Sequence, residues 1–157
     1  MKNWTFKKWN TVLGWVIFGI AFLTYLSTIE PNLSFWDAGE YIASAVKLEV
    51  THAPGAALFQ LVGAVAGLFA FGNGANYSLI IISMSALFSA FTILFLFWTI
   101  THLVRRLLNK DFEEVTLHEE ISILFAGAIG ALCFTFSDTF WFSAVEGEVY
   151  SMTSMFI

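Results

Sequence analysis

Long uncharged runs dominate the hydrophobic pattern of this chain. Residues 9–29 carry no charged side chain, and residues 79–100 are apolar apart from Ser and Thr. Because a helix needs about 20 such residues to cross a membrane, these runs predict spans at about 10–29 and 79–103. A third run, 121–137, continues past Asp138 into aromatic residues of the kind that anchor at membrane interfaces. It predicts a span at about 120–142.

Composition supports this interpretation. The 157 residues are 58% hydrophobic and 12% charged, with a mean hydropathy of +0.76, far more apolar than an ordinary soluble domain. The net charge of −5 gives no indication of nucleic-acid binding. The lipid bilayer is therefore the expected partner of the chain.

The distribution of basic residues bears on a fourth apolar run, residues 56–71. Six of the seven Lys and Arg residues lie before the first span or after the second, at positions 2, 7, 8, 105, 106 and 110. The positive-inside rule places both groups in the cytoplasm, so an even number of crossings should separate them. We therefore expect residues 55–71 to form a helix in the outer interface. The alternative is a complete span, with Arg105 and Arg106 outside.

The predicted fold is an all-α integral membrane protein. It has about three transmembrane helices, with the N-terminus in the cytoplasm, and two outer-loop helices at about 35–48 and 55–71. Residues 149–157 open a further apolar run, so we interpret the chain as the N-terminal part of a larger multi-pass protein.

This topology sorts the acidic residues into two sets. The inner set includes Thr116-x-x-Glu119, a capping box that would start the third span. The outer set faces a single lysine, Lys47. It comprises Glu30, Asp37, Glu40, Glu49, Asp138, Glu146 and Glu148.

Asp37, Glu40 and Tyr41 stand at i, i+3 and i+4, which places them on one helical face. Like charges so close make one another harder to ionise, and such a pair suits a proton acceptor. Charge at the mouth of a membrane bundle is expensive, which favours a function. The structural alternative is that Ser34-x-x-Asp37 is a capping box and Asp37 only caps a helix.

Two later segments add candidates. His52 precedes Pro54, which breaks a helix and can open the next. A histidine near the first turn of that helix could help to hold a phosphate, although a lone histidine is also common as an interfacial residue. Glu146 and Glu148 stand at i and i+2, so on a helix at most one would point into a common site; the alternative is a solvated turn.

Together these motifs resemble a known group of enzymes. The segments Phe35-Trp36-Asp37-x-Gly39-Glu40-Tyr41, His52-x-Pro54-Gly55 and Val145-Glu146-x-Glu148-Val149-Tyr150 resemble the GT-C superfamily of polytopic glycosyltransferases. More closely, they are similar to a bacterial family of unknown function, common in Bacteroidetes and related to protein O-mannosyltransferases. The resemblance covers essentially all of the chain.

The resemblance implies a glycosyltransferase that moves mannose or a similar sugar from a polyprenyl-phosphate donor to a Ser or Thr hydroxyl of an acceptor protein. Transfer would occur at the outer face of the bacterial inner membrane. Asp37 would be the base, with Glu40 beside it. The second acid would be Glu148, or otherwise Glu146. His52 would lie near the lipid phosphate, and Tyr41 is a further substrate-binding candidate.

The chain departs from the superfamily pattern at one position. Ala38 follows Asp37 where many members have a second acid, and here that acid is Glu40. No cofactor is implied, although an acid-rich site could recruit a divalent cation. A transporter is disfavoured because the spans are almost free of ionisable groups. A noncatalytic assembly subunit is the other alternative.

Overall fold

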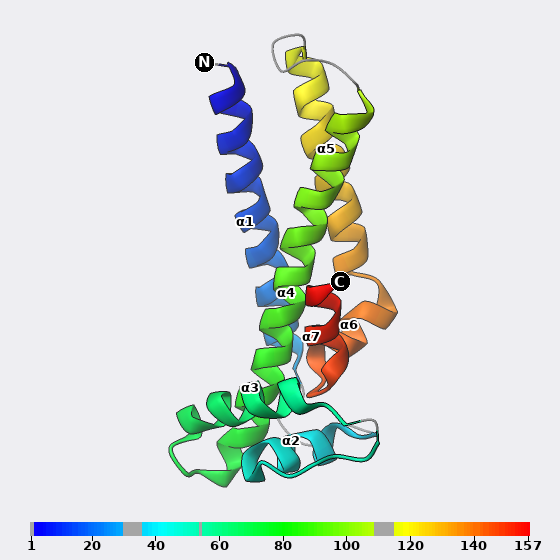
Figure 1. Cartoon of the computed structure of the whole chain (residues 1–157). Helices are drawn as coiled ribbons and strands as arrows, with labels where there is room; N and C mark the ends of the chain where they lie inside the picture. Colours follow the sequence, from blue (N-terminus) through cyan, green and yellow to red (C-terminus); the bar gives the residue numbers. More distant parts are fainter. Residues whose placement is uncertain (1, 30–35, 54, 109–114) are drawn as a thin grey trace.

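Three long helices form an upright bundle (Figure 1). The computed structural model describes residues 2–29, 36–53, 55–108 and 115–157, and these ranges contain helices but no strand. The bundle consists of α1 (Lys2–Thr28), α4 (Gly74–Leu107) and α5 (Leu117–Thr135). Each is long and apolar enough to cross a membrane. The predicted all-α membrane fold is therefore confirmed.

Two shorter helices, α2 (Ala38–Lys47) and α3 (Ala57–Gly67), lie crosswise at one end of the bundle (Figure 1). The 3-10 helix η1 (Leu68–Ala70) extends α3. The 11 residues of α3 and the 3 of η1 rise about 1.5 Å each, well short of the roughly 30 Å hydrocarbon core. The fourth apolar run is therefore a loop helix, as the charge pattern predicted.

Small residues and a few hydrogen bonds join the long helices. A Cβ added to Gly127 of α5 would lie only 2.5 Å from Thr101 Cγ2 of α4, so α4 and α5 approach closely where the side chain is absent. The Tyr25 hydroxyl of α1 donates a hydrogen bond to the Thr135 carbonyl of α5 (3.0 Å). Such bonds matter in a membrane, where water cannot satisfy polar groups.

The third span is shorter than predicted. The helix α5 ends at Thr135, and a separate helix, α6 (Asp138–Val145), follows, so the predicted continuation to 142 is wrong. The Ser137 hydroxyl donates to the Phe134 carbonyl (2.8 Å), and the Ser137 backbone is extended. A local side-chain bond thus competes with helix continuation, and Asp138 stands in the first turn of α6, where an acid is favoured. The chain then forms α7 (Val149–Phe156).

Charged residues gather at opposite ends of the bundle. The Arg105 guanidinium lies 4.7 Å from the centre of the Phe6 ring, so the start of α1 and the end of α4 lie at the same end of the bundle, as an even number of crossings requires. We call this the basic end, defined by Lys7, Lys8, Arg105 and Arg106. Its assignment to the cytoplasm stays a prediction.

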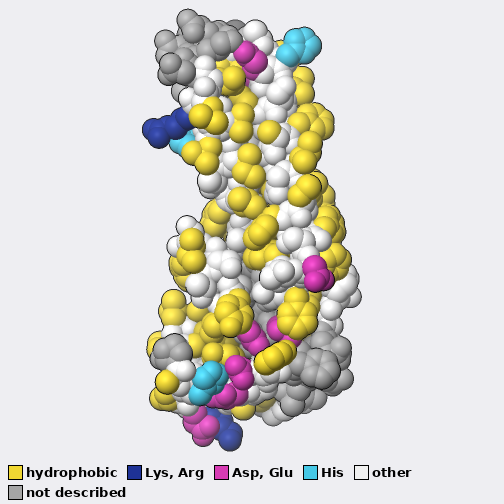
Figure 2. All heavy atoms as spheres, turned by 90° about the vertical axis from the view of Figure 1, so that its right-hand side faces the viewer, with side chains coloured by type: hydrophobic (Ala, Val, Ile, Leu, Met, Phe, Trp, Pro, Cys, Tyr) yellow, Lys and Arg dark blue, Asp and Glu magenta, His cyan; other side chains and the backbone are white. Residues whose placement is uncertain are grey.

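The other end carries many of the acids, which Figure 2 shows as a magenta group beside a histidine. We call it the acidic end, defined by Asp37, Glu40, Glu146 and Glu148. The capping box of Thr116 and Glu119 is present at the start of α5, as predicted for the inner set.

A buried cluster, here called the loop cluster, fixes the short helices to the bundle. It joins α2, α3, α4 and α7 through the side chains of Tyr41, Ile42, Ala45, Phe59, Ile81, Ile82, Met84 and Met152. The crossing of α2 over α3 is close, because a Cβ added to Gly63 would lie 2.9 Å from Ala45 Cβ.

We predict that Gly63→Ala destabilises the full-length protein. The added methyl group would push α2 and α3 apart, and overpacking of this kind typically costs about 1–3 kcal/mol. Thermal unfolding in detergent should show a lower midpoint. Gly19→Ala is the control, since a Cβ at Gly19 meets nothing within 4 Å. Equal losses in the two variants would contradict the assignment of a tight α2–α3 crossing.

Candidate functional site

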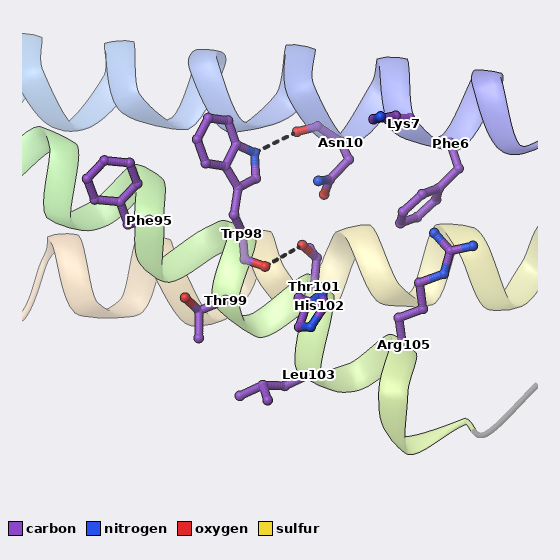
Figure 3. Close-up of a pocket in the computed structure, with 10 residues that line it drawn as sticks. All are labelled: Phe6, Lys7, Asn10, Phe95, Trp98, Thr99, Thr101, His102, Leu103 and Arg105. Atoms are coloured by element: carbon purple, nitrogen blue, oxygen red, sulfur yellow. Dashed lines mark hydrogen bonds between the residues drawn. The ribbon is translucent and has the colours of Figure 1, made fainter. Parts of the chain in front are cut away.

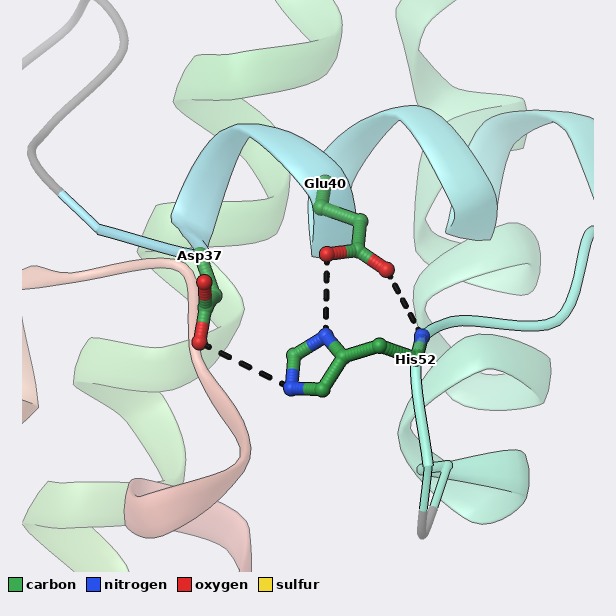
Figure 4. Close-up of side chains that lie close together, drawn as sticks. All are labelled: Asp37, Glu40 and His52. Atoms are coloured by element: carbon green, nitrogen blue, oxygen red, sulfur yellow. Dashed lines mark hydrogen bonds and ion pairs between the residues drawn. The ribbon is translucent and has the colours of Figure 1, made fainter.

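His52 connects the two acids of α2 (Figure 4). Its backbone N–H donates to Glu40 Oε1 (2.7 Å), and its ring Nδ1 lies 2.9 Å from Glu40 Oε2. The other ring nitrogen, Nε2, lies 3.8 Å from Asp37 Oδ2. Although Asp37 and Glu40 stand on one face of the helix, as predicted, an imidazole lies between their carboxylates.

Asp37 occupies the N-cap position of α2, yet its side chain makes no capping hydrogen bond. Its neighbour Trp36 has a φ of 62°, a left-handed conformation uncommon for a bulky residue. The Asp37 side chain is 54% exposed. The capping interpretation therefore does not account for its carboxylate; Ser34, the other half of the predicted capping box, lies outside the described residues.

The charge state of Glu40 differs from the expectation. Hydrogen bonds from His52 lower the pKa of Glu40, whereas a pair of like charges was expected to raise it. The same partner, Glu40, is the main cause that raises the pKa of His52, with a smaller contribution from Asp37. Glu40 and His52 therefore each favour the charged form of the other.

Glu146 and Glu148 are both buried, with 5% and 7% of their surface exposed. They follow α6 in extended backbone, in which residues i and i+2 point to the same side. Both line one cavity of about 220 Å³ together with Asp37. The expectations of a solvated turn, and of at most one acid in a common site, are therefore wrong, because this segment is extended and not helical.

Glu148 is the acid whose pKa is raised. Burial is the main cause, and the nearby charge of Asp37 adds to it. Gly147 allows this segment to pack closely against α2, because an added Cβ would lie 3.1 Å from Ile42 Cδ1. The arrangement thus places an exposed carboxylate beside a buried acid that is easier to protonate.

Tyr41 is part of the loop cluster rather than of the open site. Its ring centre lies 5.8 Å from that of Phe59 and 6.2 Å from that of His52. Burial is the main cause that raises the pKa of its phenol, followed by the charges of Asp37 and Glu148. Tyr41 therefore supports the wall of the site.

The position of His52 also differs from the expectation. The helix α3 begins at Ala57, with Ala56 as its N-cap, so His52 lies in the preceding loop and not in a first helical turn. Its ring is held by Glu40. Pro54, the predicted helix break, lies outside the described residues.

The small cavity has further lining residues that sequence reasoning did not select as site residues: Trp36, Phe142, Ser143 and Tyr150. Their aromatic rings are typical of ligand pockets. Trp36 precedes Asp37 and Tyr150 lies two residues after Glu148. This closeness in sequence to the selected acids could have identified both residues as part of the site. Phe142 and Ser143 come from α6, and only the fold brings them to Asp37.

Asp37, Glu40 and His52 could also hold a metal ion. One ligand atom from each lies within 4.8 Å of the others. Carboxylate oxygen and imidazole nitrogen are common ligands of zinc and other transition metals. Binding through the His52 ring would require neutral imidazole, and so would compete with its bond to Glu40.

Comparison with known proteins establishes the family. A family model described as the protein O-mannosyl-transferase TMEM260 N-terminal domain matches residues 37–157. The chain belongs to this family. The match begins at Asp37 and includes Glu40, His52, Glu146 and Glu148.

One curated relative is the protein O-mannosyl-transferase tmem260 of Dictyostelium discoideum, a eukaryote. It is 29% identical to this chain over 135 residues, which are 86% of the chain and 14% of that protein. The chain thus spans only 14% of the length of this relative. No solved structure matches the chain significantly. The expected relation to O-mannosyltransferases is supported.

The pair of Glu40 and His52 predicts a pH window for the order of the loop. The contribution of Glu40 is present above its ordinary pKa of 4.5 and is lost as the pH falls through its lowered folded pKa. The contribution of His52 is complete below its ordinary pKa of 6.5 and is lost as the pH rises through its raised folded pKa. The contribution of the pair is therefore complete between the two ordinary pKa values, 4.5 and 6.5, and is lost progressively outside that window.

Titration of labelled histidine by NMR tests this prediction in the full-length protein. We expect Glu40→Gln to lower the pKa of His52 toward its ordinary value, because its main partner loses its charge. Glu49→Gln removes an equal charge from the same loop and should leave the pKa of His52 nearly unchanged. An equal shift in both variants would indicate only a general effect of loop charge.

Proposed function

We propose that this chain is the N-terminal part of a membrane glycosyltransferase with Asp37 as its catalytic base. The enzyme would move mannose or a similar sugar from a polyprenyl-phosphate donor to a Ser or Thr hydroxyl of an acceptor protein. The observation that carries the proposal is the shared cavity of Asp37, Glu146 and Glu148. Membership of an O-mannosyl-transferase family supports the reaction class.

The surroundings of Asp37, Glu40 and Glu148 favour Asp37 as the base. Both oxygens of Glu40 are engaged by His52. Glu148 is buried, and its pKa is raised. Asp37 is exposed and is not used for helix capping. A base needs an oxygen that an incoming hydroxyl can reach, and Asp37 best meets that requirement.

The proposed reaction is a single displacement. The acceptor oxygen attacks the anomeric carbon while its proton passes to Asp37. The bond between that carbon and the phosphate oxygen breaks, and the lipid phosphate leaves with the electron pair. Because the attack and the departure occur on opposite faces, the configuration at the anomeric carbon inverts. Glu148 lines the same cavity and would contact the sugar there.

The proposed donor position lies beyond His52. An apolar cavity of about 390 Å³ lies between Gly55–Phe59 and α7, lined in part by Val149, Met152 and Phe156. A polyprenyl chain could enter this cavity with its phosphate toward His52, whose raised pKa favours the cationic form. The phosphate would then draw the imidazolium away from Asp37 and leave that carboxylate open to the acceptor.

The proposed orientation follows from the charge pattern. Basic residues at one end and the acids at the other favour a cytoplasmic N-terminus and an outward-facing site. The resemblance to a bacterial family supports a location in the bacterial inner membrane. A lipid-linked donor and a protein acceptor would meet at this surface.

We predict that Asp37→Asn lowers the rate of sugar transfer by about 10²–10⁴-fold, the typical contribution of a positioned base. The full-length protein would be assayed with mannosyl and other polyprenyl-phosphate sugars against peptides containing Ser and Thr. The substitution preserves the shape of the side chain, so the thermal unfolding midpoint should change little.

Glu49→Gln is the matched control, because Glu49 is an exposed acid of the same loop that lies outside the lining of the small cavity. It should retain the rate of the unsubstituted protein. Near-normal transfer by Asp37→Asn would overturn the assignment of the base. Absence of transfer with every donor, by a folded protein, would favour the noncatalytic assembly subunit.

A further inference from the structure

A third cavity lies at the basic end, far along the bundle from the acids. The helices α1 and α4 diverge toward this end (Figure 1). A cavity of about 760 Å³ opens between them, and Figure 3 shows residues of both helices directed toward it. Trp98 of α4 lines the cavity, and its indole Nε1 donates to the Asn10 carbonyl of α1 (3.3 Å).

Positive charge exceeds negative charge around this cavity. Lys7 and Arg105 line it, and His102 lies beside them. None of the described lining residues is acidic. Glu120 of α5 is close enough to interact electrostatically with Arg105. The described lining of the cavity thus holds two permanent cations and no acid, which suits it to an anion.

The remaining lining combines apolar side chains with the polar residues Asn10, Thr99 and Thr101. Phe95, Trp98 and Leu103 line the cavity, and Phe95 and Leu103 are 43% and 52% exposed. They belong to a helix long and apolar enough to span a membrane. The side-chain oxygen of Asn10 is buried and has no hydrogen-bond partner. A ligand for this cavity should therefore combine an anionic group, a hydrogen-bond donor and an apolar chain.

We propose that this cavity binds an anionic glycerophospholipid, independently of the proposed sugar transfer. The phosphate would lie between Lys7 and Arg105, where ammonium and guanidinium groups both favour it. A headgroup hydroxyl would donate to the buried oxygen of Asn10. An acyl chain would follow Phe95, Trp98 and Leu103 along α4. Basic pockets between membrane helices at the interface are suited to such headgroups.

The chain offers matched pairs of basic residues for the test. Lys7 and Arg105 line the cavity, whereas their sequence neighbours Lys8 and Arg106 are outside its lining. The double variants K7Q/R105Q and K8Q/R106Q remove the same charge at the same depth. Lipid binding to the full-length protein would be measured by native mass spectrometry, with phosphatidylglycerol and phosphatidylcholine of equal chain length.

We expect the unsubstituted protein to retain phosphatidylglycerol in preference to phosphatidylcholine. K7Q/R105Q should weaken phosphatidylglycerol binding about tenfold or more, while K8Q/R106Q should leave it nearly unchanged. Asn10→Asp keeps the shape of the side chain but adds a negative charge. Asn10→Asp should weaken phosphatidylglycerol binding to a similar extent. Because this variant keeps Arg105, its loss of binding does not come from a disturbance of the fold caused by removing Arg105.

Three results would overturn the proposal. Equal losses in the two double variants would indicate general surface charge. Displacement of the lipid by millimolar inorganic phosphate would indicate a site for free anions. Failure to retain phosphatidylglycerol, together with disulfide cross-linking of Thr99→Cys to a later helix of the full-length protein, would show that protein and not lipid covers the cavity.

Discussion

The loop cluster is the interaction on which the acidic end depends. The helices α2 and α3 have 10 and 11 residues, and isolated helices of that length are marginal in water. Tyr41 and Phe59 pack these helices against each other and against α4. Because Met152 of α7 joins the same cluster, the loop helices and the segment before α7 share one support. Asp37 and Glu148 can therefore come close although they lie far apart in the sequence.

The burial of Glu146 and Glu148 is costly by itself. A carboxylate removed from water loses hydration unless it is paired or protonated, and the raised pKa of Glu148 is the expected response. Asp37 remains exposed beside these residues, while Glu40 is paired with His52. Asp37, Glu40 and Glu148 thus occupy three different electrostatic environments within one small region. Such differences between neighbouring acids are typical of sites that transfer protons.

The bundle separates two chemically different ends. Aromatic and small side chains fill the space between its helices, and the charged residues lie mainly beyond this apolar middle (Figure 2). At one end the start of α2 and the segment from α6 to α7 build an acidic cavity. At the other end the helices diverge and leave a positive one. The same three helices therefore position both surfaces, and the membrane-spanning length keeps the surfaces apart.

The sequence by itself determined the membrane class and the three long helices, and it favoured a non-spanning helix at residues 56–71, because these features depend on local hydropathy and on the count of charges between spans. It also indicated Asp37, Glu40 and His52 through their spacing and family resemblance.

Only the tertiary structure decided how the acids are used. Pairing of Glu40 with His52, the burial of Glu148 and the contribution of Phe142 to the cavity all depend on contacts between distant segments. The end of α5 at Thr135 was also missed, since the apolar pattern of the sequence continues past it. Periodicity specifies which face a residue occupies, but a pKa depends on what packs against that face.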